Sequence, residues 1–509
     1  MGAMEVTWAL VALAVVLLLG QYLKLQWAAR KLPPGPAPLP VFGNMWALRF
    51  SLHHETLMQL AKIYGNTMTL WAGHTPLVIT NGYEAVRDML VSKSEETSGR
   101  PQTPYLLKYA QQRGVIASTG DTWKQQRRAS LTMMRKLGIG QKRKDNQIQE
   151  EAQHMIDFLT SQEGRPLNPE HLIMSCVTNV ISAAVFGHRF SFGDDVLHNL
   201  MEATKSVSPF LRSFWGMLYE TFPWLISLLP GPHQKVFDLL EYARNYVKKE
   251  VKDHQASPKE EHRDFIDLYI NTIEKAKHNP NIACDESNLV QDVMDLFFAG
   301  SETTALTLLW ALLYMLKYPD IQEKVQRELD DVLEPSETIH YEHRMKLPYT
   351  NAVIHEALRY SSIVPLALPH HCVKDTTIQG FHLEKGTVVI YNLFSVHHDR
   401  NIWEAPEEFN PSRFLDKDGN FVKNEKFIPF SAGHRACLGE QMGRTELFIF
   451  FSSLLRHFTF HLPEGVKTVN LDFIMGTTLH PLPYQIRALP RWDLSHHSAE
   501  DPEQTVTCI

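Results

Sequence analysis

The sequence predicts a mainly α chain with a minor β portion, an α+β fold with one large domain behind an N-terminal transmembrane helix. Three observations lead to this prediction. Residues 6–23 contain no charge, the patterns from about 120 to 360 are mainly helical, and short strand-like runs separated by turns occupy 364–395. Because no linker is evident between 41 and 495, we expect one domain despite the 509 residues.

The composition is that of a globular protein, with 44% hydrophobic and 21% charged residues. The mild net charge of -7 gives no reason to expect nucleic acid as a partner. Five scattered cysteines without a CxxC pair argue against a secreted disulfide framework. We therefore expect the domain to lie in a reducing compartment.

Residues 4–24 are predicted to form a single-pass membrane anchor. An 18-residue helix over 6–23 measures roughly 27 Å, about the hydrocarbon thickness of the endoplasmic reticulum membrane. The alternatives are a buried core helix and a cleaved signal peptide, but a signal peptide has its basic residues before the apolar run. Here Lys24, Arg30 and Lys31 follow it. Because positive charge stays on the cytoplasmic side, we expect the domain that follows the anchor to lie on the cytoplasmic side of the endoplasmic reticulum membrane.

The other predicted boundaries follow from composition. Residues 25–40 form a basic, proline-rich linker, in which five prolines between 32 and 40 favour a stiff polyproline II spacer. The main domain covers 41–495, and 496–509 form a polar, disordered tail. Within the domain, Gln291 to Lys317 is long and apolar enough for a helix through the centre.

The most informative segment runs from Phe430 to Gly439 and contains Cys437. Gly433 and Gly439 permit tight turns around the thiol. A helical pattern follows, so the helix N-terminus, with added charge from Arg435, favours thiolate over thiol. A lone cysteine is more often a buried inert residue, so these features alone leave both interpretations open.

The spacing Phe-x-x-Gly-x-Arg-x-Cys-x-Gly resembles the haem-binding signature of the cytochrome P-450 family, and every fixed position matches. The resemblance covers about residues 33–495 and is strongest to family 2 of the microsomal enzymes. It implies a haem-thiolate fold that binds haem b (iron protoporphyrin IX), with Cys437 as the metal ligand. Phe430, Arg435 and Gly439 are then cofactor contacts, and the thiolate favours O–O cleavage.

Two further segments match the same family. Glu356-Ala-Leu-Arg359 places its ion pair on one helix face, which alone could be an ordinary surface pair. The resemblance implies a buried structural network of Glu356 and Arg359 with Arg413.

The apolar helix contains the motif Ala299-Gly-Ser-Glu-Thr-Thr304. A glycine in mid-helix costs about 1 kcal/mol relative to alanine, and this cost is understandable if the helix must leave room for dioxygen. The resemblance makes Thr303 a catalytic proton relay with Glu302 as its acidic neighbour and places Ala299 against the cofactor; a polar kink without chemistry is the alternative.

Trp123 and Arg127 stand four residues apart, and both are hydrogen-bond donors only, which suits a carboxylate. By resemblance, Trp123, Arg127 and Arg435 bind the haem propionates. Arg100 and His370 match further propionate contacts, although the adjacent His371 could compete with His370. The pocket positions implied by the resemblance are apolar: Leu296, Phe297, Ala299, Val364, Leu366 and Leu479.

Nothing in the chain resembles a flavin or nicotinamide domain, so the electrons must come from a partner. A basic cluster includes Lys124, Arg127, Arg128, Arg135, Lys136, Lys142, Arg143 and Lys144. It could be a solvated face, or it could steer an acidic partner. The resemblance suggests NADPH–cytochrome P-450 reductase and also cytochrome b5.

Residues 209–229 are rich in aromatics, which fits either core packing or a membrane interface. With the family's known chemistry, the sequence predicts an O2-dependent monooxygenase acting on a membrane-soluble fatty acid, steroid or xenobiotic. The alternatives are a haem-thiolate isomerase or dehydratase acting on peroxides without O2, and a non-catalytic haem-binding protein. Thr303 and the unbroken cysteine loop argue against the isomerase, and a protein that only binds haem has no need of Thr303.

Overall fold

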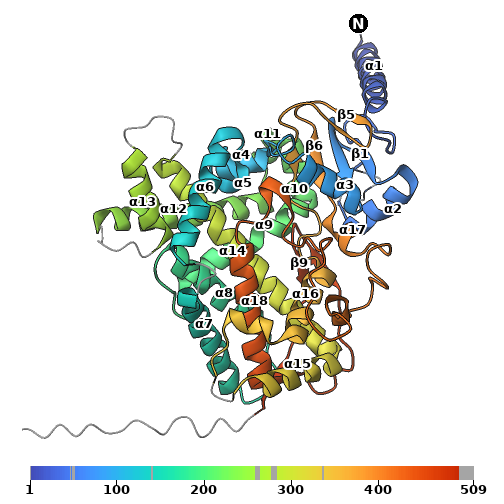
Figure 1. Cartoon of the computed structure of the whole chain (residues 1–509). Helices are drawn as coiled ribbons and strands as arrows, with labels where there is room; N and C mark the ends of the chain where they lie inside the picture. Colours follow the sequence, from blue (N-terminus) through green and yellow to red (C-terminus); the bar gives the residue numbers. More distant parts are fainter. Residues whose placement is uncertain are drawn as a thin grey trace, which may run out of the picture.

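The computed structural model describes residues 2–45, 48, 52–138, 142–257, 264–276, 284–334 and 337–491, without the side chains of 3, 142–144 and 276. The predicted tail at 496–509 lies outside the described residues. Helices dominate the fold, as the sequence predicts (Figure 1). In chain order they are α1 Ala3–Ala29, α2 His54–Tyr64, α3 Tyr83–Arg87, α4 Pro104–Ala110, α5 Gly114–Ala117, α6 Gly120–Lys136, α7 Lys142–Ser161, α8 Glu170–Val185, α9 Asp195–Arg212, α10 Phe214–Thr221, α11 Pro223–Ile226, α12 Pro232–Ala256, α13 Phe265–Ala276, α14 Glu286–Lys317, α15 Pro319–Val332, α16 Pro348–Ser361, α17 Leu393–His397 and α18 Glu440–His457.

Four shorter helical segments complete the set. They are the π-helix η1 Asp88–Ser92 and the 3-10 helices η2 Tyr341–Met345, η3 Pro411–Phe414 and η4 Gly433–Arg435.

The centre of the domain is α14, which confirms the predicted helix through the middle. It packs most extensively against α8 and also contacts α18, α12 and α16 (Figure 1). Its 32 residues are buried almost throughout. Asp285 caps its N-terminus by accepting a hydrogen bond from the Asn288 amide at 2.7 Å, which satisfies one of the free amides there.

The β portion is small and lies mainly beside the N-terminal part of the domain. In the main sheet the order is β1-β2-β6-β3, formed by β1 Thr67–Ala72, β2 Thr75–Thr80, β3 His370–His371 and β6 Val388–Tyr391. β1 and β2 form a hairpin with Thr67 opposite Thr80, and β6 adds parallel to β2 with Leu77 opposite Val388. Three two-stranded ribbons pair β4 Thr376–Ile378 with β5 Phe381–Leu383, β7 Phe458–His461 with β10 Arg487–Pro490, and β8 Phe473–Met475 with β9 Leu479–Pro481.

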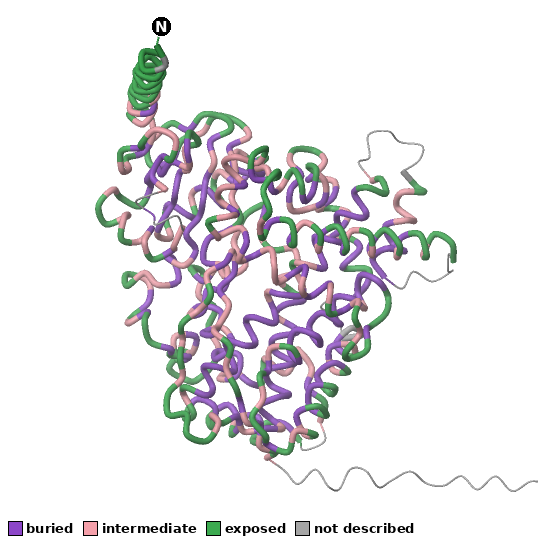
Figure 2. The backbone as a smooth tube through the Cα atoms, turned by 180° about the vertical axis from the view of Figure 1, so that it is seen from behind, coloured by how far each residue is buried: buried purple, intermediate pink, exposed green. Residues whose placement is uncertain are grey.

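The N-terminal helix α1 differs from every other helix because it projects from the domain and is exposed along nearly its whole length (Figure 2). Over Met4–Ala29 its mean hydropathy is 2.1, and it is long enough to cross a membrane. Glu286–Lys317 meets the same criterion but is 78% buried, as expected for a core helix. The apolar N-terminal helix therefore fits a membrane anchor.

Candidate active site

The segment Phe430–Gly439 forms a tight loop that presents Cys437 just before α18. The Cys437 amide donates to the Phe430 carbonyl at 2.9 Å and closes the loop. Gly433 has φ +73°, and a Cβ there would lie 1.7 Å from the Leu90 carbonyl oxygen. Only glycine permits this approach. The loop is fixed further by the His434 amide, which donates to Ser94 Oγ at 2.7 Å.

Gly439 has a different reason to be glycine. It lies in a turn, as the sequence predicts, but its φ of -90° is open to any residue, so the turn itself does not require glycine. A Cβ on Gly439 would lie 4.0 Å from Cys437 Sγ, so glycine leaves that side of the sulfur open.

The Cys437 side chain has solvent-accessible surface, whereas Cys176 and Cys372 are buried. Burial among protein atoms nevertheless raises the pKa of the Cys437 thiol; the Gly439 amide and Arg127 oppose this rise. A side chain that is accessible yet surrounded by protein faces the interior of the fold. Since a metal ion deprotonates a coordinating thiol outright, this raised pKa does not prevent Cys437 from serving as a thiolate ligand.

The cation beside the thiol is Arg127, not Arg435 as the sequence prediction had it. Arg127 donates to the Ala436 carbonyl at 2.6 Å. Arg435 instead points away from the sulfur and donates to the carbonyls of Ser98, Val115 and Ser118 at 2.6–3.1 Å. Side-chain direction, which sequence spacing does not give, decides between the two.

Three arginines and one tryptophan from three segments meet at the cysteine loop: Trp123 and Arg127 from α6, Arg435 from the loop itself, and Arg100. The Arg435 guanidinium lies 4.0 Å from the centre of the Trp123 ring. Arg100 donates to the carbonyls of Ile116, Leu368 and Pro369 at 2.9–3.1 Å. Burial lowers the pKa of Arg100 to about 10 and that of Arg435 to about 8, and repulsion from Arg127 contributes to both shifts.

This cationic cluster lacks an anion. Among the described residues, no carboxylate forms an ion pair with Arg100, Arg127 or Arg435. The indole Nε1 of Trp123 is buried without a hydrogen-bond partner. The guanidinium groups donate to neutral carbonyls, so their positive charge and the Trp123 Nε1–H remain unmatched. A buried donor needs an acceptor, and haem carries two propionates. The donor set therefore fits the cofactor that the cysteine loop implies.

His370 belongs to the same cluster, and its neighbour His371 borders it, since burial and then the charge of Arg435 lower the pKa of His371 as well. The buried His370 ring contacts the Thr97 carbonyl at 2.8 Å through Nδ1. Burial and then the charges of Arg100 and Arg435 lower its pKa well below the usual value. His371 packs over Gly99 instead, where a Cβ would lie 2.4 Å from its Nε2.

On α14, accessibility returns over one turn of an otherwise buried helix. Ala299 is exposed, and Phe298, Gly300 and Thr303 are partly accessible. Thr303 Oγ1 donates back to the Ala299 carbonyl at 2.9 Å, a bond to the preceding turn that helical threonines commonly make. The turn adjoins α18, because a Cβ on Gly443 would lie 3.6 Å from Thr304 Oγ1 and 3.8 Å from the Phe430 ring.

Gly300 has a packing role that the sequence interpretation missed. A Cβ on Gly300 would lie 3.0 Å from Ile181 on α8. The glycine thus permits the close contact between α14 and α8, and the room it leaves is occupied by Ile181.

The predicted structural network is assembled in full. Arg359 donates to both oxygens of Glu356 at 2.7 Å, and Arg413 Nε lies 3.4 Å from Glu356 Oε1. Arg359 and Glu356 are fully buried. Arg359 also donates to the carbonyls of His397, Pro406 and Glu408, so both charges are satisfied.

The predicted pocket positions separate into two groups. Ala299 is exposed and Val364 is partly accessible, whereas Leu296, Phe297, Leu366 and Leu479 are buried. Leu366 packs in the cluster beneath the main sheet with Leu57 and Ile79.

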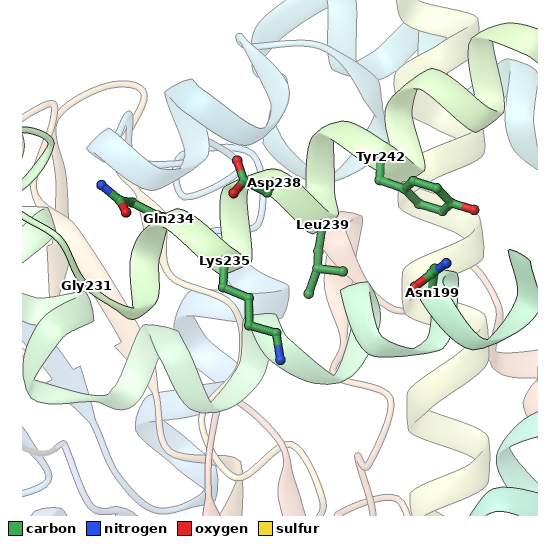
Figure 3. Close-up of a pocket in the computed structure, with 7 residues that line it drawn as sticks. All are labelled: Asn199, Gly231, Gln234, Lys235, Asp238, Leu239 and Tyr242. Carbon is green, nitrogen blue, oxygen red and sulfur yellow. The ribbon is translucent and has the colours of Figure 1, made fainter. Parts of the chain in front are cut away.

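Phe298, which the sequence reasoning did not single out, is partly accessible and contacts the Tyr109 ring at 6.2 Å between centroids. Its place one residue before Ala299 in an apolar helix gave only a weak signal. An open groove between α9 and α12, lined by Asn199, Gly231, Gln234, Lys235, Asp238, Leu239 and Tyr242, is separate from all of these residues (Figure 3).

Comparisons with known proteins agree with this geometry. Residues 33–488 match the model of the family described as cytochrome P-450. The chain is 41% identical over 461 residues to cytochrome P-450 2J2 of Homo sapiens, covering 90% of this chain and 91% of the relative. It is 40% identical over 462 residues to cytochrome P-450 2B12 of Rattus norvegicus, covering 90% and 94%. It is 39% identical over 472 residues to cytochrome P-450 2D28 of Mesocricetus auratus, covering 92% and 94%.

The relatives are microsomal membrane proteins, and the cofactor of the family is haem b. The cysteine loop, the unpaired cationic cluster and the matched length of the whole domain lead to one conclusion: this chain belongs to the cytochrome P-450 family of haem-dependent monooxygenases.

Proposed function

We propose that the protein inserts one atom of O2 into an apolar fatty acid, steroid or xenobiotic, with electrons that a reductase delivers from NADPH. The observation that carries this proposal is the shared location of three features. The accessible Cys437 lies beside a cationic cluster that has no described carboxylate, because Arg127 donates to Ala436. The accessible turn of α14 adjoins the same loop, because a Cβ on Gly443 would contact both Thr304 and Phe430. The partly accessible apolar side chains of Phe298, on that turn, and of Val364 favour an apolar substrate.

When bound, haem supplies the oxygen binding and electron transfer that protein side chains cannot. Cys437 is the proposed iron ligand, and Trp123, Arg100, Arg127, Arg435 and His370 hold the propionates. Phe430 closes the cysteine loop, because its carbonyl oxygen accepts a hydrogen bond from the Cys437 amide. Thr303 is the hydroxyl on the accessible turn of α14, where it holds a proton on Oγ1 and can pass it toward the interior. The neighbouring carboxyl group of Glu302 has a different environment, considered below.

Carbon monoxide difference spectroscopy tests the ligand. Reduced protein should give a band near about 450 nm, the signature expected of thiolate ligation. Cys437→Ser should lose that band, while Cys284→Ala, a matched change at a half-buried cysteine, should keep it. A persistent band in Cys437→Ser contradicts the proposal.

The exposed face of α6 is the proposed reductase-docking surface. Lys124, Arg128, Arg135 and Lys136 are exposed on α6, and none forms an ion pair with a described carboxylate. Free cations of one sign accelerate association with an acidic partner. Arg128→Glu with Arg135→Glu should slow reduction by reductase at low salt, whereas the distant exposed change Lys467→Glu should not. Equal reduction rates rule out this surface; cytochrome b5 is a second proposed user of it.

The region around α10 and α11 is the proposed membrane-facing entrance. Exposed apolar side chains gather there: Phe214, Trp224, Leu225, Leu228 and Leu229. Figure 1 shows α10, α11 and α1 toward the same end of the molecule. With α1 as a single anchor, followed by the basic residues Arg30 and Lys31, we propose that the domain lies on the cytoplasmic face of the endoplasmic reticulum. In nanodiscs of brominated lipid, Trp224→Phe should reduce the quenched fraction of tryptophan fluorescence; an unchanged fraction contradicts the placement.

Two other functions remain as alternatives, a peroxide isomerase or dehydratase and a non-catalytic haem protein. The Thr303 hydroxyl lies on the accessible turn of α14, and this position favours the monooxygenase over both alternatives. Substrate-dependent consumption of NADPH and O2 in the presence of reductase separates the three.

A further inference from the structure

A buried polar cluster joins three elements on the side of α14 that carries Glu302. Ser208 Oγ of α9 lies 2.6 Å from Thr478 Oγ1 in the turn between β8 and β9. Thr478 Oγ1 donates to Glu302 Oε2 at 3.4 Å. His480 Nε2 lies 3.0 Å from Glu302 Oε1. We call these four residues, Ser208, Glu302, Thr478 and His480, the Glu302 clamp.

The donors and acceptors of the clamp form one consistent set. Each hydroxyl has a single hydrogen, so Ser208 donates to Thr478 and Thr478 donates to Glu302. Ser208 Oγ in turn accepts from the Thr478 amide at 3.0 Å. His480 Nε2 lies within hydrogen-bond distance of Thr478 Oγ1, at 3.1 Å, and 3.0 Å from Glu302 Oε1, a buried oxygen without an aligned hydrogen bond in this conformation. A buried carboxylate needs such donors, so Glu302 and the turn depend on each other.

The backbone of the turn is shaped for this contact. A Cβ on Gly476 would lie 2.3 Å from Ser208 Oγ, so only glycine lets the turn approach α9. The Thr477 amide donates to the Ser208 carbonyl at 3.3 Å. Ser208, Thr478 and Glu302 are each at most 7% exposed. The cluster is therefore part of the fold's interior and differs from a chance surface contact.

Glu302 and Thr303 face different surroundings although they are adjacent. Neighbouring residues on an α-helix point about 100° apart. Thr303 lies on the accessible turn and bonds to Ala299, whereas the Glu302 carboxyl group is held by the turn. This arrangement does not suit a carboxyl group that exchanges protons with the Thr303 side.

The clamped turn leads directly into Leu479, one of the predicted pocket positions. The Leu479 amide donates to the Ile363 carbonyl at 2.8 Å, and its own carbonyl accepts from Trp310 Nε1 at 2.9 Å. Ile363 immediately precedes Val364, the partly accessible pocket candidate. Movement of the turn would thus shift Leu479 and Val364 together.

We propose that Glu302 is a positioning residue: with Ser208, Thr478 and His480 it fixes the β8–β9 turn and thereby determines how the substrate lies in the pocket. The role rests on the proposed monooxygenase function for its consequence, but the clamp itself exists without any substrate. Loss of the Glu302 clamp should make the β8–β9 turn more mobile, and this mobility should in turn change how a ligand fits the pocket.

The test uses the full-length, haem-loaded protein and three variants, Ser208→Ala, Thr478→Val and Glu302→Gln. The matched control is Thr477→Val, which changes a hydroxyl in the same turn outside the clamp. Hydrogen exchange at the amides of residues 477–479 reports on the clamp without turnover. Titration with 4-phenylimidazole, which ligates the iron and touches the pocket wall, reports on the fit.

We expect Ser208→Ala and Thr478→Val to accelerate exchange at 477–479 by about tenfold and to change the 4-phenylimidazole Kd by about fivefold. Glu302→Gln, which keeps an acceptor, should show smaller changes of the same kind, and Thr477→Val should match wild type. Wild-type exchange and Kd in the first two variants, with Glu302→Gln alone reducing product formed per NADPH, would overturn the positioning role and return Glu302 to proton transfer. The carbon monoxide band distinguishes this outcome from failure of the haem-thiolate assignment, because clamp variants should keep it.

Discussion

Two buried arginine clusters hold the domain together in opposite ways. Around Glu356, one carboxylate is shared by Arg359 and Arg413, so each guanidinium group has an anionic partner inside the protein. Around Trp123, the guanidinium groups of Arg100, Arg127 and Arg435 gather with no described carboxylate among them. The first cluster is complete as folded, whereas the second leaves positive charge unmatched. This difference separates a structural network from a site shaped for an anionic ligand.

The largest expected effect comes from breaking the complete cluster. Glu356→Ala leaves two buried guanidinium groups without a counter-charge and the Asn410 amide without its acceptor. We expect the free energy of unfolding to fall by about 3–5 kcal/mol, with or without haem. Urea unfolding of the haem-loaded and haem-free proteins measures this free energy. If the loss appears in the haem-loaded protein alone, the two clusters do not differ as described.

An intermediate effect should come from the incomplete cluster. Trp123→Phe removes an Nε1–H that has no partner within the protein but keeps a ring under Arg435. A hydrogen bond to a charged group contributes about 1.5–3 kcal/mol, so haem affinity should fall roughly tenfold to a hundredfold. The haem-free protein should change in stability by no more than about 1 kcal/mol.

Haem transfer to an excess of a scavenger protein gives the loss rate for this comparison, and Trp403→Phe is the matched control. Trp403 is also buried, but its Nε1 donates to the Val396 carbonyl. That variant should lose stability and retain haem. The reverse result, with Trp123→Phe losing stability and keeping haem, would place Trp123 with the structural residues.

The smallest effect concerns a buried charge of the opposite sign. Glu220 of α10 accepts from Thr103 Oγ1 and the Tyr105 amide, and burial raises its pKa to about 7. Because the folded pKa lies above the unfolded value, the favourable contribution is complete below about pH 4.5 and is lost as pH rises toward 7.

Glu220→Gln keeps the accepting oxygen and removes the charge. The variant should match wild type in thermal stability near pH 5 and exceed it by about 1 °C, which corresponds to about 1 kcal/mol or less, near pH 8. Scanning calorimetry of both proteins between about pH 5 and pH 8 measures this difference in thermal stability. A stability difference that does not depend on pH would show that Glu220 carries no burial penalty.

Much of this architecture could be predicted from local sequence motifs. The directions of individual side chains could not, because they depend on residues far away in the sequence. The cysteine loop, the central helix and the Glu356 network depend on short spacings, so the sequence sufficed for them. Whether Arg127 or Arg435 faces the thiol depends on carbonyls contributed more than 300 residues away. Likewise, Gly300 is explained by Ile181 on another helix, which no pattern within α14 reveals.

One helix of 17 residues, α6, carries both Trp123 and Arg127 on its inner face and Lys124, Arg128 and Arg135 on its outer face. A tilt that improves one face displaces the other. Natural variation at the two faces should therefore be correlated, and engineering a new redox partner for this enzyme by altering the outer face should require compensating changes in cofactor retention.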